Sequence, residues 1–378
     1  AGLCFLPALA ALLYALAGSL DRYLARQMLG TVGLCTLAIG VIWVLMDLQD
    51  NLNEFQEAAN PGAFLLEYYA VTLPYVFVFV IPFALMLGLL YSLGKLSNSR
   101  EIIAMIQTGR GVARVIMPLG AVGFFLSVAC LMLNYHWAPW GEGYQKALIE
   151  YAKSGSASQA RNVLYHHEDS GRTWFVGSFP YEYEKGEPLR NVAITLLGED
   201  GRPSARLKAP IVRWNKITRA WTFDDATLLD LRAELMPRFE TLETPHVIND
   251  WSETPYQIVK PGLNARYLGI PDLRSWLLEN RDVEWVNRRT YLTQWHYRWS
   301  QPWICLVVVL LAAPLGIVFS RRGAAGGVAI AVILCALMLL CARLTIGLGD
   351  AGYLSPALAA WGTNPVSYTH LTLPTKIV

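Results

Sequence analysis

The residues best suited to bind a metal ion form one short run, His166-His167-Glu168-Asp169. This run ends a β-prone stretch, and neighbouring residues of a strand point to opposite faces of the sheet. The two histidines therefore cannot easily share one ion, and a solvated strand end is the favoured interpretation. All six cysteines lie in apolar segments, where we expect small buried side chains and neither disulfides nor metal ligands.

Motifs for nucleotide binding and for hydrolysis are also missing from the sequence. Gly94-Lys95 is followed by Leu96 instead of Ser or Thr, and Gly88 stands one residue too far upstream for a phosphate-binding loop. Neither GxSxG nor HExxH occurs. We therefore expect no catalytic residue and no cofactor, and this chain cannot hydrolyse ATP by that route.

The loop from Lys95 to Arg114 carries a more informative pattern. Ser99-Arg100-Glu101 opens a predicted short helix, Glu101–Thr108, and Gly109 is its expected stop. The helix contains more apolar residues than a solvated loop needs: Ile102, Ile103, Ala104, Met105 and Ile106. Such a helix suits the groove of a cytoplasmic partner. A helix lying at the lipid interface, with its flanking arginines on headgroups, is an equally good interpretation from these residues alone.

Five long segments without any charged residue surround this loop and a polar insert. They are Leu29–Met46, Tyr68–Gly94, Val115–Leu133, Ser300–Ser320 and Ala324–Ala342. At about 1.5 Å of rise per residue, each is long enough to cross a hydrocarbon core of about 30 Å as a helix. A hydrophobic fraction of 54% against 16% charged residues agrees with an integral membrane protein.

Basic residues predict the orientation of these spans. They lie before the first segment (Arg22, Arg26), within the loop already described, and after the fourth segment (Arg321, Arg322). The hairpin from Asp47 to Tyr69 contains five acidic residues and no basic one. Under the positive-inside rule the basic regions are cytoplasmic, so the polar insert Gly141–Trp299 is predicted to lie outside the cytoplasm.

The polar insert is predicted to be an all-β domain. Its β-prone runs are Val163–Tyr165, Thr173–Val176, Val192–Leu197, Ile211–Trp214, Ala220–Phe223 and Thr227–Leu231. Turn-forming residues separate these runs, which favours a sandwich or jelly roll over an α/β enzyme. A helix at Ile270–Asn280 and an amphipathic stretch at Val283–Arg298 are expected to follow.

Several motifs, in this order, resemble one family. They are Leu20-Asp21-Arg22-Tyr23-Leu24, then Leu73-Pro74 to Pro82, then Gly94-Lys95-Leu96 with Glu101-x-x-Ala104-x-x-x-x-Gly109, then His296 to Pro302 with Ala312 to Gly316, then Gly349-x-x-Gly352 to Pro356, and finally Ala360 to Pro365. The strand pattern Ala209 to Trp214 with Trp221-Thr222-Phe223 is similar too. From about Leu20 to Val366, the chain resembles the LptF/LptG (YjgP/YjgQ) permeases, the membrane subunits of the lipopolysaccharide-export ABC transporter.

The resemblance implies an α-helical transmembrane bundle of the six-span type with an inserted periplasmic β-jelly-roll domain. The expected organisation is an apolar N-terminal segment of uncertain status (1–20), spans 1–3 with a coupling helix at about 98–109 (21–140), the periplasmic domain and following helix (141–285), spans 4–5 (286–350), a loop (351–366) and a foreign-looking tail (367–378). We expect the native chain to continue into a sixth span after Pro365, where this sequence departs from the family pattern.

The resemblance also implies location and partners. Family members lie in the bacterial inner membrane and form heterodimers with a paralogous permease. They bind a dimeric cytoplasmic ABC ATPase through their coupling helices, and pass lipopolysaccharide from the membrane to a periplasmic jelly-roll bridge protein. These sequence motifs do not distinguish between the two paralogues.

Candidate site residues fall into two groups. The first group is expected to contact the ATPase: Glu101, which aligns with the family's acidic coupling residue, together with Arg100, Ala104, Met105 and Gly109. The second group is expected to contact lipid: Arg343 near the extracytoplasmic end of the fifth span, and the strand residues Phe175, Ile194, Ile211 and Trp214. Simpler interpretations are a helix N-terminal acid for Glu101, a snorkelling arginine, and plain core for the strand residues.

Two other classes of membrane protein are possible alternatives. A mechanotransmission permease of the FtsX or MacB type usually carries a large ectodomain after its first span, whereas here three predicted spans precede the insert. A receptor with a β sensor domain needs a cytoplasmic output domain, and the longest predicted cytoplasmic stretch is the loop Lys95 to Arg114. Both fit the layout less well than an LptF/LptG permease.

Overall fold

The computed structural model describes residues 2–57, 60–109, 111–154, 158–167, 170–181, 183, 186–198, 202–232, 238–259, 262–279, 285–319, 324–362 and 364. The chain divides into two compact units. Unit 1 comprises Ala1–Leu52, Tyr69–Glu142 and Leu268–Val378, and is helical. Unit 2 comprises Asn53–Tyr68 and Gly143–Tyr267, and contains the β-sheet.

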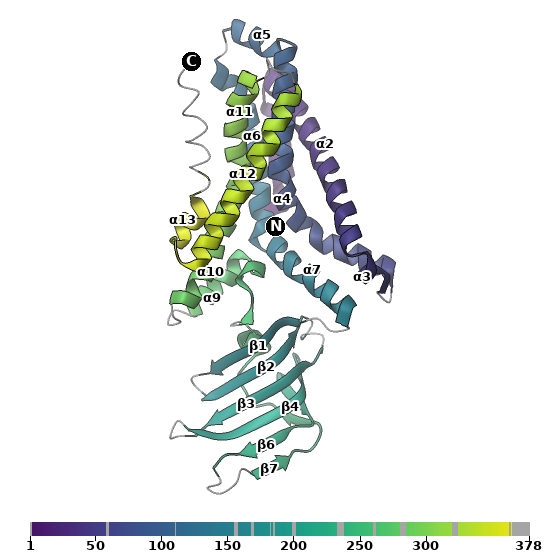
Figure 1. Ribbon diagram of the computed structural model, residues 1–378, viewed down its shortest axis with the longest axis vertical. Coiled ribbons are helices and arrows are strands. Elements are labelled where there is room, and N and C mark those ends of the chain that lie inside the picture. The colour runs from purple at the N-terminus through teal and green to yellow at the C-terminus, as the bar shows by residue number, and fades with distance from the viewer. Residues whose placement is uncertain are drawn as a thin grey trace. The chain divides into compact units, whose positions relative to one another are not determined.

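The helices that contribute to unit 1 correspond to the predicted spans and to the segments between them (Figure 1). They are α1 (Gly2–Leu16), α2 (Ser19–Asp50), α4 (Pro61–Asn98), α5 (Glu101–Gln107), α6 (Val112–Tyr135), α7 (Trp137–Ser154), α9 (Ile270–Glu279), α10 (Trp285–Ser300), the 3₁₀ turn η4 (Gln301–Trp303), α11 (Ile304–Phe319), α12 (Ala324–Ala351) and α13 (Pro356–Trp361). The first residues of α4 and most of α7 belong to unit 2.

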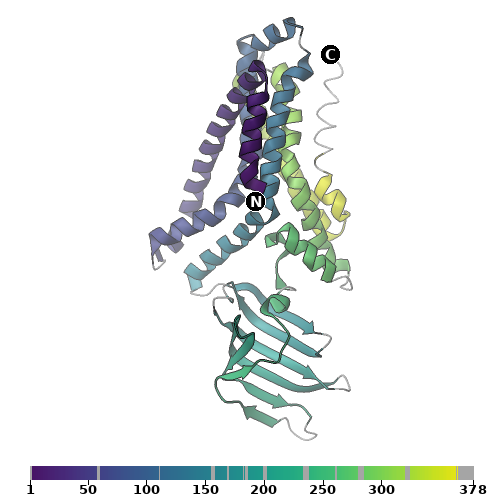
Figure 2. The same ribbon diagram turned by 180° about the vertical axis from the view of Figure 1, so that it is seen from behind.

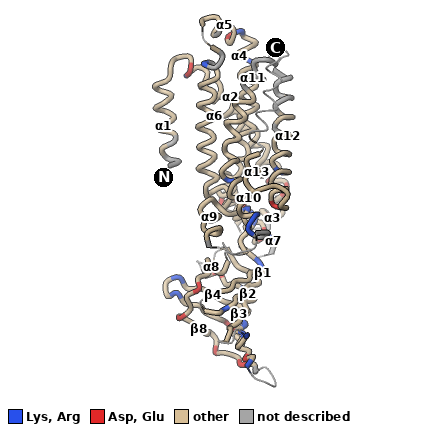
Figure 3. The backbone as a smooth tube through the Cα atoms, turned by 90° about the vertical axis from the view of Figure 1, so that its left-hand side faces the viewer, with Lys and Arg blue, Asp and Glu red and all other residues tan. Residues whose placement is uncertain are grey.

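An apolar helix lies in each of the five predicted spans. Within the described residues, Ser19–Asp50, Pro61–Asn98, Ile116–Tyr135 and Val332–Ala351 are long and apolar enough to cross a membrane. The remaining predicted span is α11, a helix of 16 residues that continues from α10 through η4. Figure 3 shows that the helices of unit 1 carry almost no charged residue along their middle parts. The prediction of a transmembrane helical bundle is thereby confirmed.

The core of unit 1 is one apolar cluster to which α2, α4, α6 and α11 contribute. Leu24, Met28 and Val32 of α2 are buried in one apolar cluster with Leu89 and Leu93 of α4. The two helices approach closely at Gly88, since a Cβ added there would lie 2.7 Å from Cγ2 of Val32. One face of the first half of α2 is thus buried in this cluster, whereas Leu37, Val41 and Leu45 in its second half are exposed.

Unit 2 is built on one eight-stranded antiparallel sheet. Its strands are β1 (Ser158–His167), β2 (Arg172–Pro180), β3 (Leu189–Leu197), β4 (Pro203–Asn215), β5 (Ala220–Asp224), β6 (Thr227–Asp230), β7 (Arg238–Thr241) and β8 (His246–Ile248). The order is β1-β2-β3-β4-β5-β8, and β6 pairs with both β4 and β7. Strands β5 and β6 pair with different parts of the same edge of the long β4. The all-β prediction is confirmed, and the six predicted runs fall within β1 to β6, apart from Leu231, which follows β6 directly.

A line of irregular positions crosses the first four strands and bends the sheet. In each strand two buried residues are separated by three positions instead of two: Ala160 and Val163, Val176 and Phe179, Leu189 and Val192, Ala209 and Val212. The residues between them are paired from strand to strand, Arg161 with Ser178, Ser178 with Arg190, and Arg190 with Ile211. Asn162 and Asn191 adopt positive φ angles along this line. Because the alternation of buried residues shifts at the same line in all four strands, the buried residues on both sides of the line form one continuous apolar surface.

Aromatic rings and one helix cover this apolar surface. The ring of Trp174 lies 4.8 Å from that of Trp221 and 5.3 Å from that of Trp251, which follows β8. Indole Nε1 of Trp221 donates a 2.9 Å hydrogen bond to the carbonyl oxygen of Glu253. Helix α8 (Pro255–Val259) then buries Ile258 and Val259. The short helices α3 (Leu52–Glu57) and η3 (Ala265–Tyr267) complete the described elements.

Candidate coupling site and lipid-contact residues

The short helix predicted between the second and third spans is present as α5. It begins directly after Arg100, whose φ is +60° and whose carbonyl oxygen accepts the hydrogen bond from the Ala104 N–H. It ends before Gly109, whose φ of +84° lies in the left-handed region that favours glycine. The sequence prediction of this helix and of its glycine stop is confirmed.

The apolar residues of α5 divide between two faces. Ile102 is buried in the core cluster of unit 1, and Met105 packs against the same cluster. Ile103 and Ala104 are exposed. The helix is therefore anchored by one face and offers a small apolar surface on the other. Arg100 is exposed beside it, whereas Arg110 lies outside the described residues.

The carboxylate of Glu101 is held by two hydroxyl groups. Oη of Tyr23 in α2 donates a 2.9 Å hydrogen bond to its Oε2, and Oγ of Ser99 donates a 2.8 Å hydrogen bond to its Oε1. A carboxylate can accept about four hydrogen bonds. Glu101, which is only half-buried, therefore retains the capacity to accept hydrogen bonds from a basic partner.

A second contact joins α2 to the far end of the same loop. Guanidinium NH2 of Arg114, at the start of α6, lies 2.8 Å from Oδ2 of Asp21. Arg114 is half-exposed, whereas only 15% of the Asp21 side chain is exposed. Asp21 and Tyr23 belong to the motif Leu20 to Leu24, which predicted no role for either side chain. Their partners are distant in the sequence, so no local pattern could have indicated these contacts.

The lipid-contact candidates are distributed over both units. Arg343 lies in α12 of unit 1, with its side chain exposed. In unit 2, Ile194 is fully buried, and Trp214 lies against the ring of Trp221 at 4.7 Å. Phe175 and Ile211 are only half-buried.

Phe175 also differs from its neighbours in direction. It stands between the fully buried Trp174 and Val176, and alternation along a strand places it on the opposite face. The buried apolar surface of the bent sheet is thus formed by these two neighbours and by Val163 and Ile194 instead.

The two histidines of the metal-like run point to different partners. Nδ1 of His166 lies 2.9 Å from Oγ1 of Thr173, and Nδ1 of His167 lies 2.9 Å from Oγ of Ser170. Glu168 and Asp169 lie outside the described residues. Within the described part of the chain, no three His, Cys, Asp or Glu side chains are grouped as metal ligands.

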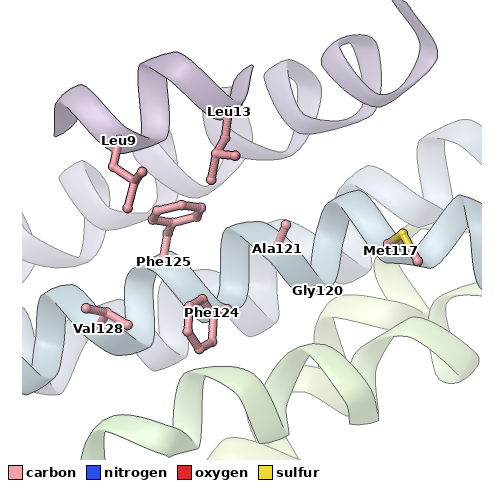
Figure 4. A pocket seen from close by; sticks show the side chains of 8 residues that line it. All are labelled: Leu9, Leu13, Met117, Gly120, Ala121, Phe124, Phe125 and Val128. Atoms are coloured by element: carbon pink, nitrogen blue, oxygen red, sulfur yellow. The ribbon is translucent and has the colours of Figure 1, made fainter. Parts of the chain in front are cut away.

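One apolar groove lies between α1 and α6, which run side by side (Figure 2). Its volume is about 530 Å³, and Leu9 and Leu13 of α1 point toward Phe125 of α6 (Figure 4). Met117, Gly120, Ala121, Phe124 and Val128 complete its lining. No lining side chain carries a group capable of acid–base chemistry or ion binding.

A buried polar network lies where α10 passes into α11. Pro302 has no N–H to give to the carbonyl oxygen of Arg298, four residues earlier. Nδ2 of Asn134 in α6 donates a 2.9 Å hydrogen bond to that oxygen instead. Asn364 donates a 3.1 Å hydrogen bond to the carbonyl oxygen of Ser300 in the same way. These two asparagines were not among the predicted site residues.

Long apolar helices precede and follow an antiparallel β domain in the sequence, and this order is typical of a multi-span membrane protein. Within this class, the short helix α5 lies between the spans α4 and α6 and is anchored by Ile102. The family described as "Lipopolysaccharide export system permease LptF/LptG" matches residues 22–367, and the chain belongs to this family. Members of the family are transport permeases and not enzymes.

Individual relatives agree with this assignment. The chain is 22% identical over 354 residues to the lipopolysaccharide export system permease protein LptF of Escherichia coli strain K12. The alignment covers 91% of this chain and 90% of that protein. The protein of the same name from Shigella flexneri matches with the same identity and coverage.

Proposed function

We propose that this chain is a permease subunit that extracts lipopolysaccharide from the inner membrane and passes it toward a periplasmic bridge protein. It pairs with a paralogous permease, and a separate dimeric cytoplasmic ABC ATPase supplies the energy. Family membership supports the transport class. The main support for a coupling role is the placement of side chains on α5. Ile102 anchors this helix in the core, and Ile103 and the Glu101 carboxylate lie on its outer side.

The proposed orientation follows from charge. The basic residues around α5 and in the first turns of α2 are cytoplasmic, and the acidic hairpin around α3 is periplasmic, together with the sheet of unit 2. In this orientation α5 is accessible to a cytoplasmic ATPase, and unit 2 is accessible to a periplasmic bridge.

In the proposed coupling contact, Glu101 pairs with a basic residue of the ATPase. Truncating one partner of a desolvated charge pair costs roughly 2–5 kcal/mol. We therefore expect Glu101→Lys to abolish co-purification of the ATPase from detergent. The control is Asp50→Lys, which makes the same charge change at an exposed position, the last residue of α2. Undiminished association and export with Glu101→Lys would contradict this contact.

In the proposed lipid contacts, Arg343 attracts a phosphate of the lipopolysaccharide headgroup. The strand residues Ile194, Ile211 and Trp214 lie along the path of the acyl chains, and Phe175 lies on the opposite face of the sheet from Ile194. Photocrosslinking of lipopolysaccharide to the permease should fall in Arg343→Gln and be retained in Arg343→Lys, because the lysine keeps the positive charge. Equal crosslinking in both variants and the native chain would argue against a phosphate role for Arg343.

A further inference from the structure

The N-terminal part of α2 contacts both ends of the loop that contains α5. Tyr23 reaches Glu101 at the first residue of α5, and Asp21 reaches Arg114 at the start of α6. Asp21 and Tyr23 are two positions apart in the sequence, whereas Glu101 is the first residue of α5 and Arg114 follows α5 at the start of α6. One turn of α2 therefore fixes the position of the segment that carries the coupling helix.

Tyr23 is suited to this task because its own backbone is held firmly. The next residue, Leu24, is 2% exposed, and Met28 one turn further is fully buried. The close approach of Gly88 to Val32 packs the same half of α2 against α4. The Tyr23 hydroxyl is thus carried by a packed helix of 32 residues, whereas Glu101 belongs to a helix of only seven residues.

The hydrogen bonds of Glu101 show what this contact does. Tyr23 occupies Oε2 and Ser99 occupies Oε1, so each oxygen is fixed in position by one donor. Each oxygen keeps a second lone pair, which suffices for a guanidinium or ammonium group. Without the Tyr23 hydroxyl, Ser99 alone would hold the carboxylate, and its side chain would gain rotamer freedom that partner binding must remove.

We propose that Tyr23 is a positioning residue that pre-orients the Glu101 carboxylate for a basic side chain of the partner ATPase. This inference rests on the proposed coupling function of Glu101. It assigns Tyr23 no direct contact with the partner.

A double-mutant cycle on the affinity for the ATPase tests this role. The permease heterodimer containing the full chain is titrated in detergent with the purified dimeric ATPase of the same export system. The variants are Tyr23→Phe, Glu101→Ala and the double variant. Loss of one pre-orienting hydrogen bond should weaken binding about threefold to tenfold in Tyr23→Phe. In the Glu101→Ala background the same change should alter the affinity by less than about twofold, because the group it orients is gone.

Tyr91→Phe is the matched control. Tyr91 lies in α4 and is 47% exposed, and the structure gives its hydroxyl no hydrogen bond to another described residue. This variant should bind like the native chain. Thermal unfolding of all variants in detergent checks that the helical unit stays folded.

Three results would overturn the positioning role while leaving the coupling contact intact. They are native affinity in Tyr23→Phe, tighter binding in Tyr23→Phe (the hydroxyl would then compete with the partner), and equal weakening in both backgrounds. Native affinity in Glu101→Ala would overturn the coupling contact itself, and the positioning role with it.

Discussion

Glu253 shows how a single residue stabilises the bent sheet. Its side chain is fully buried, and Nε of Arg172 lies 2.7 Å from its Oε1. Burial alone would raise the pKa of Glu253, but a backbone hydrogen bond and those from Arg172 and Ser170 outweigh it and lower the pKa. Arg172 also lies over the ring of Trp251, 4.8 Å from its centre. Glu253 therefore ties the segment after β8 to the hairpin of β1 and β2.

The stability of unit 2 should depend on pH through this carboxylate. Because its folded pKa lies below the usual value of 4.5, its contribution is complete above that pH and is lost as the pH falls through the folded pKa. Glu253→Gln should cost about 1–3 kcal/mol at neutral pH, since Arg172 loses its counter-charge.

Denaturant unfolding followed by tryptophan fluorescence, on the full chain in detergent, measures this effect at a series of pH values. Glu240→Gln alters an exposed glutamate in β7 and should leave the unfolding midpoint unchanged. A difference between the native chain and Glu253→Gln that persists unchanged at pH 3 would rule out the carboxylate as its source.

At the scale of elements, α2 and α4 pack closely because Gly88 of α4 has no side chain to separate it from Val32 of α2. Gly88→Ala would place a methyl group 2.7 Å from Cγ2 and 2.9 Å from Cα of Val32. Because a backbone atom cannot give way easily, we expect a loss of about 1–3 kcal/mol and a lower melting temperature in detergent. Gly94→Ala in the same helix meets nothing within 4 Å and should leave the melting temperature unchanged or raise it slightly. Equal melting temperatures for both variants would show that α2 and α4 are less closely packed.

The break between α10 and α11 gives a second prediction at this scale. Asn134→Ala removes the donor that replaces the missing N–H of Pro302, so it should destabilise the helical unit by about 1–3 kcal/mol. In Pro302→Ala an N–H becomes available for the Arg298 carbonyl, and adding Asn134→Ala should then cost less. Melting temperatures in detergent measure both effects, and an equal cost in both backgrounds would contradict this explanation.

Elements were predictable from the sequence where the pattern was local. Apolar length indicated the helices α2, α4, α6, α11 and α12, and β-branched runs indicated β1 to β6. The short strands β7 and β8 have three or four residues and lack a run long enough to detect. The bend of the sheet depends on positive φ at Asn162 and Asn191, which look like ordinary polar strand residues in the sequence.

For the whole molecule, the layout and family were accessible from the sequence, whereas the contacts around the candidate site were not. The order of apolar segments and motifs sufficed to indicate an LptF/LptG permease. Glu101 stood out as the only acid of its loop, but its bond to Tyr23 joins residues 78 positions apart. Likewise, the pairing of Asn134 with Arg298 spans 164 positions. Such contacts depend on the packed fold.

The most direct test of the proposed function is ATP-driven release of lipopolysaccharide from proteoliposomes. These contain the full chain, its paralogous permease and the ABC ATPase, with the periplasmic bridge protein added as acceptor. We expect transfer of lipopolysaccharide to the acceptor that requires ATP and is lost with Glu101→Lys. ATP hydrolysis by the assembled complex without transfer, or transfer that proceeds equally without this chain, would contradict it.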